Sequence, residues 1–76
     1  MWKEENNRLQ RSFVFPDFVS AFAFLTKVAF LAEKHAHHPA IYNVYNRVEL
    51  SLCTHEAGNT VTDKDRCLSQ AIDALL

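Results

Sequence analysis

The sequence has one glycine, Gly58, and only two cysteines among its 76 residues. Walker and dinucleotide-binding loops need several glycines where the backbone approaches the phosphates, so both kinds of nucleotide site are excluded. Two cysteines form no disulfide framework, and by themselves they do not supply the four ligands of a structural zinc site. We interpret Cys53 and Cys67 as reduced thiols, which predicts a cytoplasmic chain.

The chain also lacks an excess of positive charge, since 8 Lys and Arg face 9 Asp and Glu for a net charge of −1. A protein that binds nucleic acid by electrostatics normally carries a basic patch, so we expect no nucleic-acid partner. The longest apolar-rich stretch, residues 28–32, is far too short to span a bilayer. The polar N-terminus lacks the apolar centre of a signal peptide. We therefore expect no membrane association.

Apolar residues, in contrast, make up 49% of the chain and include six Phe, two Tyr and one Trp. This length allows one small domain, which we assign to residues 1–76. A domain of this size buries only about 60% of the surface of its chain. Association with further copies of the chain is a common way to cover the rest, so we expect a homo-oligomer.

The N-terminal part predicts a hairpin. Apolar and polar residues alternate over residues 8–15, as they do in a half-buried strand. Asn6 and Asn7 tolerate the positive φ angles of a tight turn, which makes residues 2–5 a short partner strand. Pro16 ends the strand because proline cannot donate a hydrogen bond to a sheet.

A helical repeat follows, from Phe18 to Lys34 or His35, with Asp17 as a good N-cap. The spacing predicts a buried face formed by Phe18, Ala21, Phe22, Leu25, Val28, Ala29 and Ala32. A second apolar set lies outside this stripe and consists of Val19, Phe24, Phe30 and Leu31. One interpretation is a deeply packed helix whose flanks touch the sheet edges. We favour the other, in which Phe24, Phe30 and Leu31 contribute to a contact between subunits.

A second hairpin is predicted over residues 42–45 and 47–54. After a loop at Gly58 and Asn59, Thr62 is a good N-cap for a second helix, whose first turn carries favourable negative charge. The apolar faces predicted for these elements consist of Val48, Leu50, Leu52, Leu68, Ala71, Ile72 and Leu75. The order ββαββα predicts an α+β fold of two layers, a four-stranded antiparallel sheet with both helices packed on one face.

Four histidines in 76 residues are the main chemical feature. His35, His37 and His38 lie at the end of the first predicted helix. His55 ends the last strand. Histidine exchanges protons near neutral pH because its ordinary pKa is about 6.5. A solvated helix end is the simplest interpretation and a zinc site is another, although the spacing puts no two ligands on one helix face. Cys67 is a weak nucleophile candidate, because it falls on the predicted buried side of its helix.

Metal-free acid–base chemistry is a third interpretation. Pro39 forces the chain out of the helix after His37 and His38, and the hairpin then returns the chain, which allows His55 to converge on the same cleft. Two histidines on opposite sides of a ligand can act as base and acid in one turnover. Glu33, one helical turn before His37, is placed to orient that imidazole.

Four segments, in this order, resemble the pterin-4a-carbinolamine dehydratase family: Glu33-Lys34-x-x-His37-His38-Pro39, Tyr42-Asn43-Val44-Tyr45-Asn46-Arg47-Val48, Thr54-His55-Glu56 and Thr62-x-x-Asp65. The resemblance extends from Trp2 to the second helix and so covers nearly the whole chain. The ββαββα order that it implies agrees with the order derived from the residue pattern.

The resemblance implies a metal-independent hydro-lyase that removes water from 4a-hydroxytetrahydrobiopterin and gives quinonoid dihydropterin, in the recycling of tetrahydrobiopterin. The pterin is the substrate, and no cofactor is implied. By position, His37 and His55 match the catalytic acid–base pair of the family, and His38 matches the histidine that holds the pterin ring. The other residues that match those lining or supporting the substrate site are Glu33, Pro39 and Asp65.

The resemblance also implies a homodimer or homotetramer and a functional link to an aromatic amino acid hydroxylase, which generates the carbinolamine. Ile41 stands where the family often has Trp, and we expect the extra N-terminal helix of many members to be absent. The alternative function is a non-catalytic interaction or dimerisation module, because the animal branch also serves as a dimerisation cofactor for a homeodomain transcription factor. The matched histidines favour the enzyme, since a scaffold does not need them.

Overall fold

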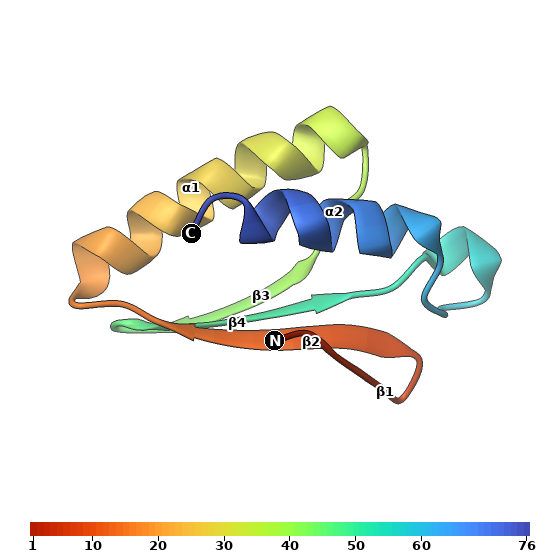
Figure 1. The fold of residues 1–76 in the computed structure, drawn as a ribbon, viewed down its shortest axis with the longest axis horizontal. Coiled ribbons are helices and arrows are strands. Elements are labelled where there is room, and N and C mark those ends of the chain that lie inside the picture. The colour runs from red at the N-terminus through yellow and green to blue at the C-terminus, as the bar shows by residue number, and fades with distance from the viewer.

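Four strands and two helices form two layers in the computed structural model, which describes residues 1–76 (Figure 1). The elements are β1 (Lys3–Glu5), β2 (Arg8–Val14), α1 (Phe18–His35), β3 (Ala40–Val44), β4 (Arg47–Leu52), the 3₁₀ turn η1 (His55–Ala57) and α2 (Asp63–Asp73). The sheet is antiparallel in the order β1-β2-β4-β3, and both helices cover one of its faces. The predicted α+β fold is confirmed, whereas the turn η1 was not foreseen.

The first hairpin turns where the two asparagines predicted it. Asn6 and Asn7 have φ angles of 52° and 62°, the left-handed pair of a tight hairpin turn. The turn sets the register in which Glu4 lies opposite Leu9. The sequence therefore predicts this hairpin correctly, including the short first strand.

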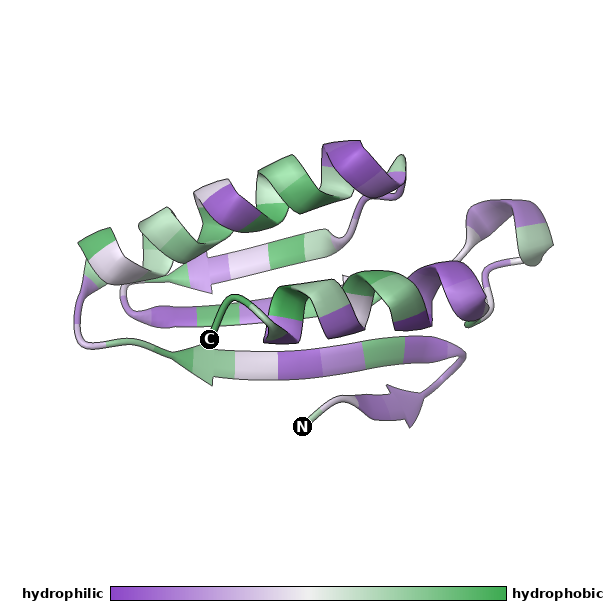
Figure 2. Ribbon diagram, turned by 45° about the horizontal axis from the view of Figure 1, so that its top comes forward, coloured by the Kyte–Doolittle hydropathy of each residue, from purple (hydrophilic) through white to green (hydrophobic).

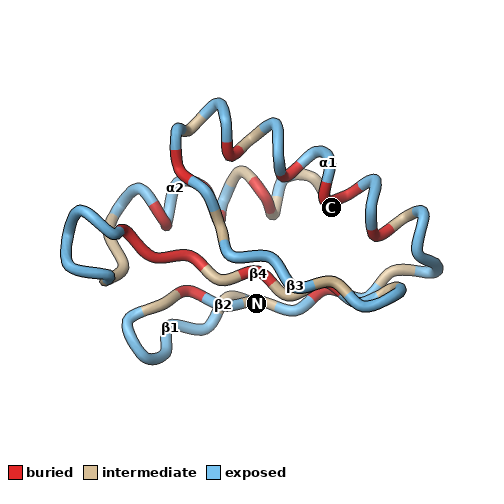
Figure 3. The backbone as a smooth tube through the Cα atoms, turned by 180° about the vertical axis from the view of Figure 1, so that it is seen from behind, coloured by how far each residue is buried: buried red, intermediate tan, exposed pale blue.

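The core lies between the sheet and the two helices. β4, in the interior of the sheet, buries every second residue, and Figure 3 shows buried positions along it and on the inward sides of the helices. The core cluster consists of Leu9, Phe13, Ala21, Phe24, Leu25, Val28, Val48, Leu50, Leu52, Leu68 and Ile72. Burial of each large apolar side chain contributes about 1.5–3 kcal/mol to folding.

The predicted face of α1 is partly wrong. Phe24 is buried and packs on Phe13 and Phe15, with ring centroids 4.8 Å and 5.0 Å away. Phe22, expected in the core, is 54% exposed. Figure 2 shows hydrophobic residues along most of α1, so only its packing against the sheet selects the buried side. The expected role of Phe24 in a subunit contact is therefore wrong, whereas Leu31 is only partly buried against the core.

Both helices begin at the predicted caps. Asp17 accepts the backbone N–H of Ser20 at 2.8 Å at the start of α1, and Thr62 caps α2. Along α2, Leu68 and Ile72 are buried as predicted, but Cys67 is exposed because it lies about 100° around the helix from Leu68. Neither helix is long and apolar enough to cross a membrane.

Candidate active site

His37 lies in the turn that ends α1. Ala36 takes the left-handed conformation, with a φ of 50°, and the backbone N–H of His37 donates to the carbonyl of Ala32 at 3.0 Å. These are the bonds of a helix end of the Schellman type. The turn carries the imidazole of His37 into the protein, where Nε2 lies 2.5 Å from Oδ1 of Asp65.

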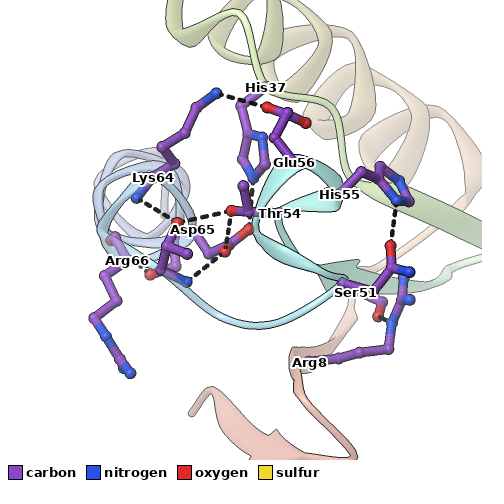
Figure 4. A network of polar contacts seen from close by, with 12 residues as sticks. Arg8, His37, Ser51, Thr54, His55, Glu56, Lys64, Asp65 and Arg66 are labelled. Carbon is purple, nitrogen blue, oxygen red and sulfur yellow. Dashed lines mark hydrogen bonds and ion pairs between the residues drawn. The ribbon is translucent and has the colours of Figure 1, made fainter.

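Asp65 belongs to the first turn of α2 and is fully buried. Its second carboxylate oxygen, Oδ2, accepts the backbone N–H of Thr62 and the hydroxyl of Thr54, both at 2.8 Å. The bond from Thr62 completes a capping box at the start of α2. One carboxylate therefore ties together the end of α1, the chain after β4 and the beginning of α2 (Figure 4).

The carboxyl group of Asp65 is an anion at neutral pH. Burial by itself raises the pKa of Asp65, but hydrogen bonds from His37, Thr62 and Thr54 and the charge of His37 together bring that pKa below its ordinary value of 3.8. A carboxylate only accepts hydrogen bonds, so Nε2 of His37 is the donor in this pair. Nδ1 is then the ring nitrogen of His37 that remains for exchanging a proton with a ligand.

His38 is exposed, whereas its neighbour His37 is buried. Nε2 of His38 lies 2.6 Å from Oε2 of Glu33, and both side chains are exposed. The expectation that Glu33 orients His37 is therefore wrong: Glu33 pairs with His38. The physical reason is the left-handed turn at Ala36, which ends the helical spacing on which that expectation depended.

His55 begins the turn η1 and is exposed. Its Nδ1 lies 2.6 Å from Oδ1 of Asn59, an acceptor, so Nδ1 donates and Nε2 is the nitrogen available to a ligand. Figure 4 shows the ring of His55 on the far side of Thr54 from Asp65. The positive φ angles of Gly58 and Asn59, 84° and 60°, close the loop that brings Asn59 back to His55.

An ion pair between Lys64 and Glu56 lies beside His37. Nζ of Lys64 is 3.3 Å from Oε1 of Glu56, and Figure 4 shows the carboxylate of Glu56 next to the ring of His37. The pKa of Glu56 is lowered by its own backbone N–H, by Lys64 and, less strongly, by the charge of His37. The surroundings of His37 therefore hold one buried carboxylate and one exposed carboxylate that a lysine neutralises.

The two surface pockets lie away from these histidines. One, of about 290 Å³, is on the sheet and includes Gln10, Tyr42 and Glu49. The other, of about 430 Å³, lies between α1 and β3 and includes Phe22 and Ile41. No histidine lines either pocket. No group of three His, Cys, Asp or Glu side chains is arranged to hold a metal ion.

Comparison with known proteins places this chain in a family. A profile of the family described as Pterin 4 alpha carbinolamine dehydratase matches residues 1–75. The chain belongs to this family. A relative from Rhizorhabdus wittichii is 50% identical over 76 residues, which are 97% of this chain and 77% of the relative. Another, from Chloroflexus aurantiacus, is 51% identical over 75 residues, 99% of this chain and 80% of the relative. Both carry the provisional name pterin-4-alpha-carbinolamine dehydratase.

Two solved structures share the pterin dehydratase fold of this chain. The crystal structure of a transcriptional coactivator/pterin dehydratase from Brucella melitensis matches with a TM-score of 0.90 and 40% identity, over 96% of this chain and 79% of that one. A pterin dehydratase-like protein identified as a RuBisCO assembly factor in the alpha-carboxysome matches with a TM-score of 0.78 and 25% identity. The match covers 99% of this chain and 86% of that one. The names in this family therefore include roles other than catalysis.

The structure brings some residues of the expected dehydratase site into contact and leaves others apart. His37 pairs with Asp65, and His38 pairs with Glu33. His55 bonds to Asn59, not to another histidine.

Sequence reasoning gave no role to Thr54 or Asn59. The spacing Thr62-x-x-Asp65 was a usable signal for part of the network, because it is the pattern of a capping box. Pro39 lies between the histidine turn and β3, as expected.

Proposed function

We propose that this chain is a pterin-4a-carbinolamine dehydratase, a hydro-lyase that removes water from 4a-hydroxytetrahydrobiopterin and gives quinonoid dihydropterin. The observation that carries the proposal is the buried pair of His37 and Asp65, in which one ring nitrogen is held and the other is left for a ligand. Membership of the family supplies the substrate class.

The reaction needs a base and an acid. The base takes the proton from a ring nitrogen of the pterin, the freed electron pair forms a C=N bond to C4a, and the C–O bond breaks. The acid protonates the departing hydroxyl, which leaves as water. His37, through Nδ1, and His55, through Nε2, form the proposed pair, because each has its other ring nitrogen held by the protein. The proposed mechanism uses no metal and no cofactor.

The exposed residues near this pair have the proposed role of binding. His38 holds the pterin ring, oriented by Glu33, and Pro39 shapes the turn from which His38 projects. Asp65 was expected to line or to support the site. Its complete burial and its bond to His37 favour support without direct contact with the substrate.

The test is the decay of enzymatically generated 4a-hydroxytetrahydropterin, followed by absorbance. The wild type should accelerate it, and His37→Ala and His55→Ala should each lower the rate by about 100-fold or more, the usual contribution of a general acid or base. His35→Ala is the matched control, since His35 has no side-chain hydrogen bond in the structure, and it should keep the wild-type rate. A folded wild type without acceleration would refute the proposal.

The wider setting is also part of the proposal. We place the reaction in tetrahydrobiopterin recycling after an aromatic amino acid hydroxylase, in the cytoplasm, where the free thiols of Cys53 and Cys67 stay reduced. We propose a homodimer or homotetramer, because Val19 and Phe30 are exposed on α1 beside Phe18 and Phe22. Light scattering that gives a monomer at micromolar concentration would contradict the oligomer.

The second candidate function is a non-catalytic interaction module. It is favoured by the same exposed apolar side chains of α1 and by the coactivator and assembly-factor names of the two solved structures. The two candidates differ in what they require of the histidines. A module keeps its binding when His37 and His55 are replaced, whereas a dehydratase loses its activity.

A further inference from the structure

We propose that Thr54 is a positioning residue for His37: its hydroxyl holds the Asp65 carboxylate so that His37 carries a proton on Nε2 and presents Nδ1 to a ligand. The effect on catalysis rests on the proposed dehydratase function. The effect on the imidazole does not, because it follows from the hydrogen bonds of the protein alone.

The direction of every hydrogen bond in this network follows from counting donors. Asp65 is a carboxylate and accepts only, so the single hydroxyl proton of Thr54 points to its Oδ2, 2.8 Å away. Oγ1 of Thr54 also lies 2.7 Å from Oγ1 of Thr62. Since Thr54 has no second proton, Thr62 is the donor of that bond. The bonds therefore run one way, from Thr62 through Thr54 to Asp65.

The other oxygen of Asp65, Oδ1, accepts the last hydrogen bond of this network. With Oδ2 engaged by Thr54 and by the backbone N–H of Thr62, Oδ1 is the oxygen that faces Nε2 of His37. If the hydroxyl of Thr54 is removed, Oδ2 keeps only the bond from the backbone N–H of Thr62, and the carboxylate can turn so that Oδ1 no longer faces Nε2. His37 can then take the other neutral form, with its proton on Nδ1, which blocks the nitrogen that meets a ligand.

Thr54 is itself rigidly held. Its backbone N–H donates to the carbonyl of Thr60 at 2.8 Å, and its carbonyl accepts the N–H of Asn59 at 3.0 Å. Its side chain is buried together with Asp65, away from water that could replace a missing donor. An unmade hydrogen bond at a buried carboxylate is costly, so the hydroxyl at this position is worth more than an exposed one.

The other charged groups around His37 are not changed by a substitution at Thr54. They are Glu56 and Lys64, which pair with each other at 3.3 Å, and the pair of Glu33 and His38 at the end of α1. A change seen at His37 in a Thr54 variant is therefore assigned to the carboxylate of Asp65.

The first experiment needs no substrate. Nitrogen-15 NMR of the full chain, labelled at histidine and held in mildly alkaline buffer, reports which ring nitrogen of His37 carries the proton. The wild type and Thr54→Ser should show protonated Nε2, and Thr54→Val should show a mixture of the two forms. Thr60→Val is the matched control, because it makes the same change in the same loop at a hydroxyl that forms no hydrogen bond.

The second experiment measures the dehydration rate of the same variants. Thr54→Val should lower kcat by about 10-fold, the order typical of supporting residues, with KM nearly unchanged, and Thr54→Ser should restore kcat. If Thr54→Val does not fold, Thr54→Cys takes its place. Its thiol is a weak donor, so its kcat should lie between the kcat of the wild type and a complete loss of activity.

Three results would overturn the proposal: a single Nε2-protonated form of His37 in folded Thr54→Val, the same change in Thr60→Val, or no rescue by serine. Failure of the dehydratase function is distinguishable. In that case no variant and no wild type accelerates the reaction, while the NMR pattern of His37 still separates Thr54→Val from Thr54→Ser.

Discussion

Two neighbouring histidines each contact a carboxylate, at almost equal distances but in opposite surroundings. His37 lies 2.5 Å from Asp65, with side chains 7% and 0% exposed. His38 lies 2.6 Å from Glu33, with side chains 65% and 77% exposed. Coulomb attraction and hydrogen bonding are strong in the first environment and are screened by water in the second. The comparison teaches that burial, and not distance, decides how much each pair contributes.

Breaking the buried pair should have the largest effect. Asp65→Asn keeps the shape of the side chain but removes the charge that His37 faces. We expect the free energy of unfolding to fall by about 1–3 kcal/mol, since the variant replaces charge-assisted hydrogen bonds at a buried site and leaves a donor of the network without an acceptor. The dehydration rate should fall on the order of 100-fold or more, because the tautomer of His37 is no longer fixed. Urea unfolding and initial rates measure the two effects.

Asp63→Asn serves as the matched control for this variant. Asp63 is exposed in the same first turn of α2, so its free energy of unfolding should stay within about 0.5 kcal/mol of wild type. Equal losses in the two variants would show that charge at the helix start, and not the pair with His37, is responsible.

Acid should remove the contribution of the buried pair. The pKa of Asp65 in the folded chain is below its ordinary value of 3.8, so the unfolded chain binds the proton first. The stability that Asp65 contributes is complete above about pH 5 and is lost as the pH falls through the lowered pKa. The difference in unfolding free energy between wild type and Asp65→Asn should therefore shrink below that pH. Urea titrations at several acid pH values test this, and a constant difference contradicts it.

Breaking the exposed pair should have the smallest effect on stability. Glu33→Gln should change the free energy of unfolding by less than about 0.5 kcal/mol. Because His38 has the proposed role of holding the pterin, KM should rise while kcat stays close to wild type. High salt added to the wild type should cause little of the loss of stability seen in Asp65→Asn, since buried charges are screened far less than exposed ones. A large loss of stability in Glu33→Gln would remove the contrast between the two pairs.

The fold was predictable where a local rule decides the structure. Asn6 and Asn7 turn the first hairpin, and Asp17 and Thr62 begin the helices, because each of these residues satisfies its own backbone surroundings. The buried face of α1 was less predictable. Its apolar residues surround most of the helix, so the choice of Phe24 over Phe22 depends on packing against distant strands.

The candidate site, like the fold, was predictable only in part. Its histidines stand out by type and by resemblance to the family, but their partners do not. His37 and Asp65 are 28 positions apart, and no local spacing connects them. Helical spacing paired Glu33 with the wrong histidine, because a single left-handed residue, Ala36, breaks the repeat one position earlier.

The capping box at the start of α2 makes a backbone amide a reporter on the candidate site. The N–H of Thr62 donates to the same carboxylate that holds His37. Each time the first turn of α2 opens, this amide can exchange its hydrogen with solvent, and His37 loses the support of Asp65 at the same moment. The exchange rate of the Thr62 amide therefore measures how often the imidazole is out of position.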